Sequence, residues 1–253
     1  MQVDFYSDAL GRGAQMCALL PEAPVPANGF PTLYLLHGMG DDHTAWTRYT
    51  SIERYAKDRQ LAVIMPETRL GWYANTCAGE RYFDHVSDEI VRLSRRMLPG
   101  LSRGREDTFV AGLSMGGYGA FRLALNRPDV FSKAASLSGA LDAASVARSN
   151  GDLGDSAYWA DTFGPAEAVP GSAHDLFHTA QRLKENRPEL WMWCGTEDFL
   201  YADNLRMRDH LRALGYALTY SEGPGDHTWR HWDRQIQNAL DWLIPAKEVE
   251  ACR

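Results

Sequence analysis

The stretch Thr108-Phe-Val-Ala-Gly-Leu-Ser114-Met-Gly-Gly-Tyr-Gly119 contains the signal that decides how this chain folds. Its first part, Phe109 to Leu113, is a short apolar run of the kind that forms a buried parallel strand. From Ala120 to Asn126, apolar residues are spaced as in a buried helix. Gly112-x-Ser114-x-Gly116 stands between the two, and its glycines permit a sharp turn that leaves the serine hydroxyl accessible. We therefore predict Ser114 as a nucleophile on a strained strand-to-helix turn, the alternative being an ordinary glycine-rich turn.

The same alternation of strand and helix extends along the whole chain. Apolar runs predict short buried strands at 32–37, 61–66, 108–113, 133–139 and 190–195, and a last strand is predicted at 217–220. Helical patterns lie between them at 51–60, 82–98, 115–126, 202–214 and 229–243. This order is typical of an α/β fold with a mainly parallel central sheet and helices on both faces. The first residues are expected to add a hairpin at the edge of the sheet.

Length and composition favour one domain over two. The chain has 253 residues, of which 45% are hydrophobic and 23% charged, so residues 1–253 can bury one sizeable core. No internal repeat or interdomain linker is present. The segment 141–188 mixes Gly, Asp, Ser, Ala and Pro without a clear strand, so we interpret it as a cap-like insertion that covers the active site.

Charge and cysteine usage narrow the class of partner. The net charge is -7 and no run of Lys or Arg forms a basic patch, so nucleic acid is not an expected partner. The N-terminus lacks a basic region followed by an apolar stretch, and no segment reaches membrane-spanning length, which favours a cytoplasmic protein without a membrane partner. Four cysteines (Cys17, Cys77, Cys194, Cys252) lack the paired spacing of a disulfide framework or zinc site, so we expect reduced thiols and no metal.

A serine nucleophile needs a histidine base, and three histidines stand late enough in the chain to provide one. His227 lies in Gly223-Pro-Gly-Asp-His-Thr-Trp229, a loop of turn formers between the last predicted strand and the last helix. His231 is the alternative, although it should already lie inside the helix. His210 falls within a helical run, where a surface role is simpler. We predict His227 as the base.

The carboxylate that orients this base is expected between the nucleophile and the histidine in chain order. The predicted strand Trp191-Met-Trp-Cys-Gly195 runs into Thr-Glu197-Asp198, which supplies two carboxylates. We predict Asp198 for this role. Glu197 stays open, since either carboxylate could instead cap the following helix.

An acyl-transfer site also needs N–H donors for the oxyanion. The first is the N–H of Met115, directly after the nucleophile. The second is expected in the loop Leu36-His-Gly-Met-Gly40, where Gly38 allows close approach of the substrate and Met39 offers its N–H. Trp72 and Tyr73, just after another predicted strand, are interpreted either as walls of the substrate pocket, together with Gly38, or as rim packing.

Five spaced motifs together resemble a known family. These are Leu35-Leu-His-Gly-Met39, Gly71-Trp-Tyr73, Ala111-Gly-Leu-Ser-Met-Gly-Gly-Tyr-Gly119, Cys194-Gly-Thr-Glu-Asp-Phe-Leu-Tyr201 and Asp226-His-Thr-Trp229. Their order and spacing resemble the esterase D-like α/β-hydrolases, and among these the bacterial tributyrin esterases, over nearly the whole chain. The resemblance implies an α/β-hydrolase fold and a serine carboxylesterase that cleaves acetyl to butyryl esters through an acyl-enzyme, without a cofactor.

Carried over residue by residue, the family's catalytic triad falls on Ser114, Asp198 and His227, and its oxyanion donors fall on Met39 and Met115. The family also includes S-formylglutathione hydrolases and feruloyl and acetylxylan esterases, so the resemblance specifies the chemistry better than the small-molecule substrate. It also permits a homo-oligomer. The alternative of another class is a catalytically silent hydrolase fold used as a binding module, for which a broken triad would be expected.

Overall fold

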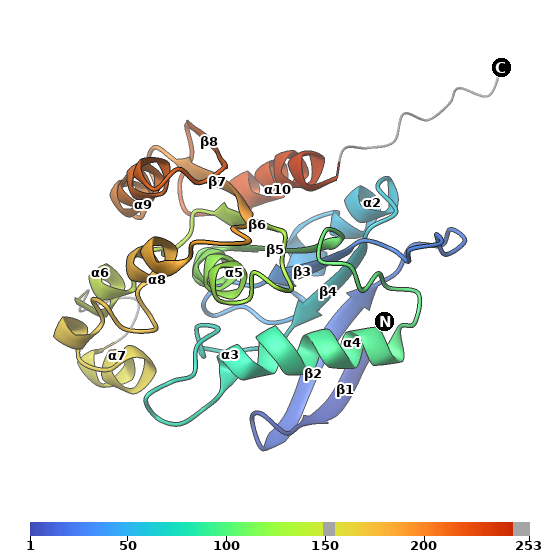
Figure 1. Cartoon of the computed structure of the whole chain (residues 1–253), viewed down its shortest axis with the longest axis horizontal. Helices are drawn as coiled ribbons and strands as arrows, with labels where there is room; N and C mark the ends of the chain where they lie inside the picture. The colour runs from blue at the N-terminus through green and yellow to red at the C-terminus, as the bar shows by residue number, and fades with distance from the viewer. Residues whose placement is uncertain (149–154, 245–253) are drawn as a thin grey trace.

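The structure of the protein is a computed structural model that describes residues 1–148 and 155–244 (Figure 1). Part of the predicted insertion, 149–154, and the cysteine at position 252 lie outside the described residues. Within the described ranges, no helix is both long enough and apolar enough to cross a membrane.

A single sheet of eight strands forms the centre of the molecule, in the order β1-β2-β4-β3-β5-β6-β7-β8. β1 and β2 form an antiparallel hairpin at one edge, β2 pairs antiparallel with β4, and the remaining neighbours are parallel. The predictions of a mainly parallel sheet and an N-terminal hairpin are confirmed. The strands are β1 (Gln2–Ser7), β2 (Arg12–Leu19), β3 (Thr32–Leu36), β4 (Ala62–Pro66), β5 (Thr108–Leu113), β6 (Lys133–Leu137), β7 (Glu189–Gly195) and β8 (Leu218–Gly223).

The central strands are apolar throughout because both faces of the sheet are covered. Every residue of β3, β4 and β5 is buried. Successive side chains of a strand point to opposite faces, so in β3 Leu33 and Leu35 enter one apolar cluster while Tyr34 and Leu36 enter the other. A strand covered on both sides therefore shows the continuous apolar run from which it could be predicted.

Helices lie on both faces of the sheet, as predicted (Figure 1). One face is covered by α1, α2 and α10, which contribute Trp46, Ile52 and Ile236 to its cluster. The other carries the remaining long helices. The helices are α1 (Ala45–Tyr49), α2 (Ile52–Lys57), α3 (Tyr82–Asp84), the π-helix η1 (His85–Ile90), α4 (Val91–Met97), α5 (Met115–Asn126), α6 (Ala143–Arg148), α7 (Ser156–Phe163), the 3₁₀-helix η2 (Ala166–Ala168), α8 (Leu176–Arg182), α9 (Tyr201–Ala213) and α10 (Trp229–Leu243).

The helical stretch predicted at 82–98 contains a π-helical segment that sequence periodicity did not indicate. Over η1 the side chains of His85 and Glu89 both turn toward Ser7 of β1. The His85 Nδ1 atom lies 2.7 Å from a Glu89 oxygen and 3.0 Å from Ser7 Oγ. This buried polar cluster ties the helix to the edge hairpin, a tertiary contact that a one-dimensional pattern does not contain.

The described part of segment 141–188 is helical and packs over α5. α6, α7 and α8 come from this segment, and α8 contacts α5. Trp159 and Phe163 of α7 join the apolar cluster that includes Tyr118 of α5. The segment is therefore attached to the helix that begins directly after Ser114.

Candidate active site

Ser114 lies at the sharp turn from β5 into α5, in the middle of the sheet. Its backbone has φ 52° and ψ −117°, a conformation that side-chain-bearing residues rarely adopt and that costs on the order of 1–3 kcal/mol. The turn is tight because Gly112 and Gly116 approach closely: a Cβ on Gly112 would come within 2.3 Å of the Gly116 carbonyl oxygen. Glycine is therefore required here, and the serine is held partly exposed above the strand end.

Ser114, His227 and Asp198 form one continuous hydrogen-bonded chain. His227 Nε2 lies 3.0 Å from Ser114 Oγ, and His227 Nδ1 lies 2.9 Å and 3.1 Å from the two Asp198 oxygens. Because an ionised carboxylate only accepts, Nδ1 carries the proton and Nε2 is left to accept the serine hydroxyl proton. The Asp198 side chain is fully buried, whereas that of His227 is 19% exposed.

The topology explains how residues so far apart in sequence come together. Ser114, Asp198 and His227 follow β5, β7 and β8, respectively, and these strands run parallel. The carboxyl ends of parallel strands meet at one edge of the sheet, which is where open α/β sheets bind their ligands.

The alternative acid and bases lie elsewhere. Glu197 accepts hydrogen bonds from the Gly225 N–H and from Thr196 Oγ1. His231 lies 3.4 Å from an Asp226 oxygen and stacks on Trp193. The ring of His210 hydrogen-bonds to the Phe177 carbonyl. None of these three joins the hydrogen-bonded chain at Ser114.

The two predicted oxyanion donors flank the serine. Met115 is the first residue of α5, so its N–H has no acceptor within the helix and lies at the positive end of the helix dipole. Met39 follows β3, which pairs directly with β5. Gly38 brings the two loops together, because a Cβ there would stand 2.6 Å from Leu113 Cδ1 and 3.8 Å from Ser114 Cβ.

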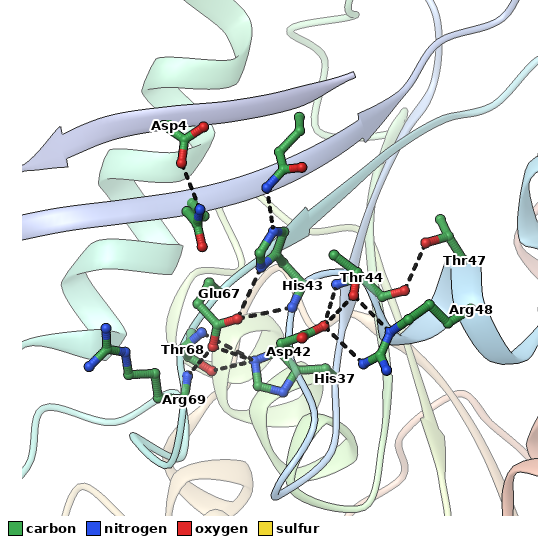
Figure 2. A network of polar contacts seen from close by, with 12 residues as sticks. Asp4, His37, Asp42, His43, Thr44, Thr47, Arg48, Glu67, Thr68 and Arg69 are labelled. Atoms are coloured by element: carbon green, nitrogen blue, oxygen red, sulfur yellow. Dashed lines mark hydrogen bonds and ion pairs between the residues drawn. The ribbon is translucent and has the colours of Figure 1, made fainter.

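A polar network that sequence reasoning missed holds the Met39 loop in place (Figure 2). The Thr68 N–H donates to His37 Nε2 at 3.2 Å, so the ring proton is on Nδ1, which donates to the Gly38 carbonyl at 2.8 Å. That carbonyl belongs to the same planar peptide unit as the Met39 N–H. By holding one end of the unit, His37 sets the direction of the Met39 N–H at the other.

Glu67 anchors the rest of this loop (Figure 2). One of its oxygens accepts from both the backbone N–H and Nδ1 of His43, each at 3.1 Å. Burial opposes ionisation of the carboxyl, but the nearby imidazoles of His37 and His43 and the hydrogen bonds from His43 and the Arg69 N–H outweigh burial and hold the Glu67 pKa well below its usual range. The only signal in the sequence was that His37 and Glu67 each directly follow a strand residue.

Trp72 and Tyr73 are not placed as walls of an open pocket. Both side chains are buried, and both residues have φ near 50°, which turns them into the interior. The Trp72 indole donates to the Tyr158 hydroxyl at 2.8 Å, and the Tyr73 hydroxyl donates to the His37 carbonyl at 2.9 Å. In these contacts the two rings support the cap segment and the loop 36–40 from within, which favours packing over the interpretation as pocket walls.

The remaining predicted features concern thiols and metals. Cys17, Cys77 and Cys194 are free thiols. Cys77 is exposed, and its N–H donates to the Thr162 carbonyl of α7 at 3.4 Å. Within residues 1–148 and 155–244, no group of three or more His, Cys, Asp or Glu side chains is arranged to hold a metal ion.

The central sheet, its helices and the serine turn are those of an α/β-hydrolase, and comparison with known proteins specifies the family. The chain belongs to the family described as "Putative esterase", whose model matches residues 7–243. It is 31% identical over 259 residues to an acetyl esterase of Caldicellulosiruptor saccharolyticus, with 96% of this chain and 97% of the relative covered. The protein is therefore a carboxylic-ester hydrolase.

Solved structures agree with this assignment. The fluorophosphonate-binding serine hydrolase F of Staphylococcus aureus has a TM-score of 0.88 at 34% identity, with 96% of this chain and 97% of the other covered. An S-formylglutathione hydrolase, FrmB, from the same organism has a TM-score of 0.84 at 34% identity and the same coverage. The predicted α/β-hydrolase fold is thus confirmed.

Proposed function

We propose that this protein is a serine esterase that hydrolyses short-chain acyl esters, from acetyl to butyryl, with Ser114 as nucleophile, His227 as base and Asp198 as its orienting carboxylate. The observation that carries the proposal is the continuous hydrogen-bonded chain from Ser114 Oγ through the His227 imidazole to buried Asp198. A serine hydroxyl is a weak nucleophile unless a positioned base removes its proton as it attacks. This arrangement meets that requirement.

In the first half of the reaction, Ser114 Oγ attacks the ester carbonyl while its proton passes to His227 Nε2. Asp198 holds the imidazole in the correct tautomer and stabilises the cation that forms. The carbonyl oxygen becomes an oxyanion, to which the N–H groups of Met39 and Met115 donate. The intermediate then breaks its bond to the alcohol oxygen, which takes the proton from His227, and the acyl-enzyme remains.

In the second half, water replaces the alcohol. His227 Nε2 accepts a proton from the water as its oxygen attacks the acyl carbonyl, and the same two N–H groups hold the new oxyanion. The bond to Ser114 Oγ breaks, the serine recovers its proton from His227, and the carboxylic acid leaves.

The preference for short acyl groups rests on likeness to relatives. The acetyl esterase of Caldicellulosiruptor saccharolyticus is similar over 96% of this chain, and the motifs resemble tributyrin esterases. We place the protein in the esterase D-like group on the same basis, with small-molecule esters as its partners. The free thiols of Cys17, Cys77 and Cys194 are consistent with a reducing, cytoplasmic location.

A thioester is the second candidate substrate. The similar structure of an S-formylglutathione hydrolase has 34% identity over 96% of this chain. Ser114, activated by His227 and Asp198, would attack an ester or a thioester carbonyl in the same way. The fit of the leaving group therefore decides which of the two substrates is preferred.

The test is hydrolysis of p-nitrophenyl esters from acetate to decanoate, with S-formylglutathione and methyl ferulate as competing substrates. We expect the highest kcat/KM for acetate to butyrate and its loss in Ser114→Ala by at least about 10³-fold, since the nucleophile is removed. Circular dichroism of the variant checks that it is folded. Faster turnover of the thioester or of ferulate would reassign the substrate, and full activity of Ser114→Ala would refute the proposed nucleophile.

A further inference from the structure

Phe199 is an exposed aromatic residue that lies directly against the proposed catalytic base. It is 60% exposed, and its ring centroid lies 4.5 Å from that of His227 with the planes inclined by 51°. Buried Trp232 contacts the same imidazole from 4.8 Å. Single exposed apolar residues are common on protein surfaces and carry no meaning alone. What distinguishes Phe199 is its contact with the group that transfers the proton.

Core packing does not account for the position of this ring. Among the described residues, the two apolar clusters that cover the faces of the sheet do not include Phe199. Its chain neighbours have structural roles: Asp198 holds the imidazole, and Leu200 is buried in one of the clusters. The Phe199 side chain instead presents apolar surface to solvent beside His227, where a bound molecule would cover it.

The loop that carries Phe199 is held by hydrogen bonds on both sides. The Asp198 N–H donates to the Gly195 carbonyl at 3.2 Å, and the Tyr201 N–H donates to the Asp198 carbonyl at 2.9 Å. The Leu200 N–H donates to an Asp198 side-chain oxygen at 2.9 Å. The backbone is thereby ordered before any ligand arrives, which lowers the entropy cost of binding against the ring.

The chemistry of the site assigns this ring to one part of the substrate. His227 Nε2 must deliver its proton to the leaving alcohol oxygen, so that oxygen has to come within hydrogen-bond distance of the imidazole. The carbonyl oxygen points instead to Met39 and Met115. A ring packed on His227 therefore meets the group attached to the leaving oxygen.

We infer that Phe199 forms the wall of an alcohol subsite that favours esters whose alcohol carries an aromatic ring, such as phenyl esters. This inference rests on the proposed function and adds the class of alcohol to it. Two aromatic rings in contact gain binding free energy beyond that of their buried area alone. This gain corresponds to a preference of about 2- to 12-fold for an aromatic over a non-aromatic alcohol group.

The experiment compares three acetates: phenyl, cyclohexyl and trifluoroethyl acetate. All three form the same acetyl-enzyme, so its later hydrolysis does not depend on the alcohol. The alcohol influences only the acylation step, which kcat/KM reports. In Phe199→Leu we expect kcat/KM for phenyl acetate to fall about 2- to 12-fold relative to trifluoroethyl acetate. Cyclohexyl acetate should change less, and Phe199→Tyr, which keeps the ring, should restore the wild-type ratio.

Two controls separate this role from a structural one. Tyr6→Leu changes another exposed aromatic, 67% exposed on β1, and should leave all three ratios unchanged. An equal loss for every acetate in Phe199→Leu, with a shifted pH profile of kcat/KM, would show that Phe199 only positions His227 and would overturn the inference. An equal loss for phenyl and cyclohexyl acetate would overturn the aromatic preference. Failure of wild-type protein to hydrolyse any acetate would instead refute the proposed function.

Discussion

At the scale of single residues, two neighbouring carboxylates with different contacts offer a direct test of the site. Asp198 is buried against His227, whereas Glu197 is exposed and accepts from the Gly225 N–H and Thr196. We expect Asp198→Asn to lower kcat by roughly 10³- to 10⁴-fold, because an amide leaves the imidazole in the wrong tautomer, as for the corresponding change in the serine proteases. Glu197→Gln, which keeps an acceptor for Gly225, is the matched control and should stay within a few-fold of wild type.

The measurement is kcat and KM for p-nitrophenyl acetate, with circular dichroism of both variants. A loss in Glu197→Gln as large as that in Asp198→Asn would mean that the orienting carboxylate is misassigned or shared.

Sequence reasoning placed some residues of the candidate site well and others poorly, for physical reasons. Ser114 directly follows β5, and Asp198 and His227 lie in the loops after β7 and β8. Because parallel strand ends meet at one edge of the sheet, their convergence could be predicted. Trp72 and Tyr73 could not, because their orientation depends on a left-handed backbone at both positions. Bulky residues avoid that conformation unless tertiary contacts enforce it.

At the scale of elements, the doubly covered strands and the long helices were predictable, whereas of the short helices α1 and α6 were not and α2 was, within the pattern at 51–60. α5 and α10 begin and end at the predicted residues because their apolar spacing extends over three turns or more. α1 has five residues and α6 six, too few for periodicity to register. Such short helices depend on packing for their stability.

The attachment of the cap segment to α5 yields a prediction at this scale. The Tyr118 hydroxyl donates to the His174 carbonyl at 3.0 Å and accepts from Arg122 Nη1 at 2.9 Å, and all three groups are buried. Tyr118→Phe leaves both partners short of a hydrogen bond, so we expect a loss of about 1–3 kcal/mol in the free energy of unfolding.

Urea unfolding measures this loss, and Tyr216→Phe is the control. The Tyr216 hydroxyl also reaches the cap segment, where it donates to the Ala180 carbonyl, but among the described residues it makes one hydrogen bond where Tyr118 makes two. Removal of the Tyr216 hydroxyl should therefore lower the free energy of unfolding by less than Tyr118→Phe does. If Tyr118→Phe were as stable as wild type, the hydroxyl would not anchor the segment.

At the scale of the whole molecule, buried His174 predicts how stability depends on pH. Burial, and then the charge of Arg122, lower its pKa from 6.5 to about 4. The groups that face it are Arg122 of α5 and the Phe163 ring of α7. As pH falls from 6.5 toward 4, the unfolded chain gains a proton on this histidine that the folded chain does not, so stability is present above that window and is lost within it.

Two carboxylates lose their contribution mainly below the window between pH 6.5 and 4.5. Glu67 and Glu89 have pKa values below their usual 4.5, so most of the stability that they contribute is lost at lower pH. The His85 pKa is also lowered by burial, and this residue therefore acts in the same direction as His174. A substitution is needed to separate the contribution of His174 to the pH dependence from that of His85.

Urea unfolding at pH 6.5 and at pH 4.5 gives the drop in the free energy of unfolding between these two pH values. We expect this drop to be about 2 kcal/mol smaller in His174→Phe than in wild type. The phenyl ring preserves the contact with Phe163, and His174 Nδ1 has no hydrogen-bond partner among the described residues that would be lost. His178→Phe, at a partly exposed position of α8, is the control and should keep the wild-type dependence on pH. Identical pH dependence in His174→Phe and wild type would show that His174 is protonated alike in the folded and unfolded states. The loss of stability would then have to arise at other groups, with His85 the first to test.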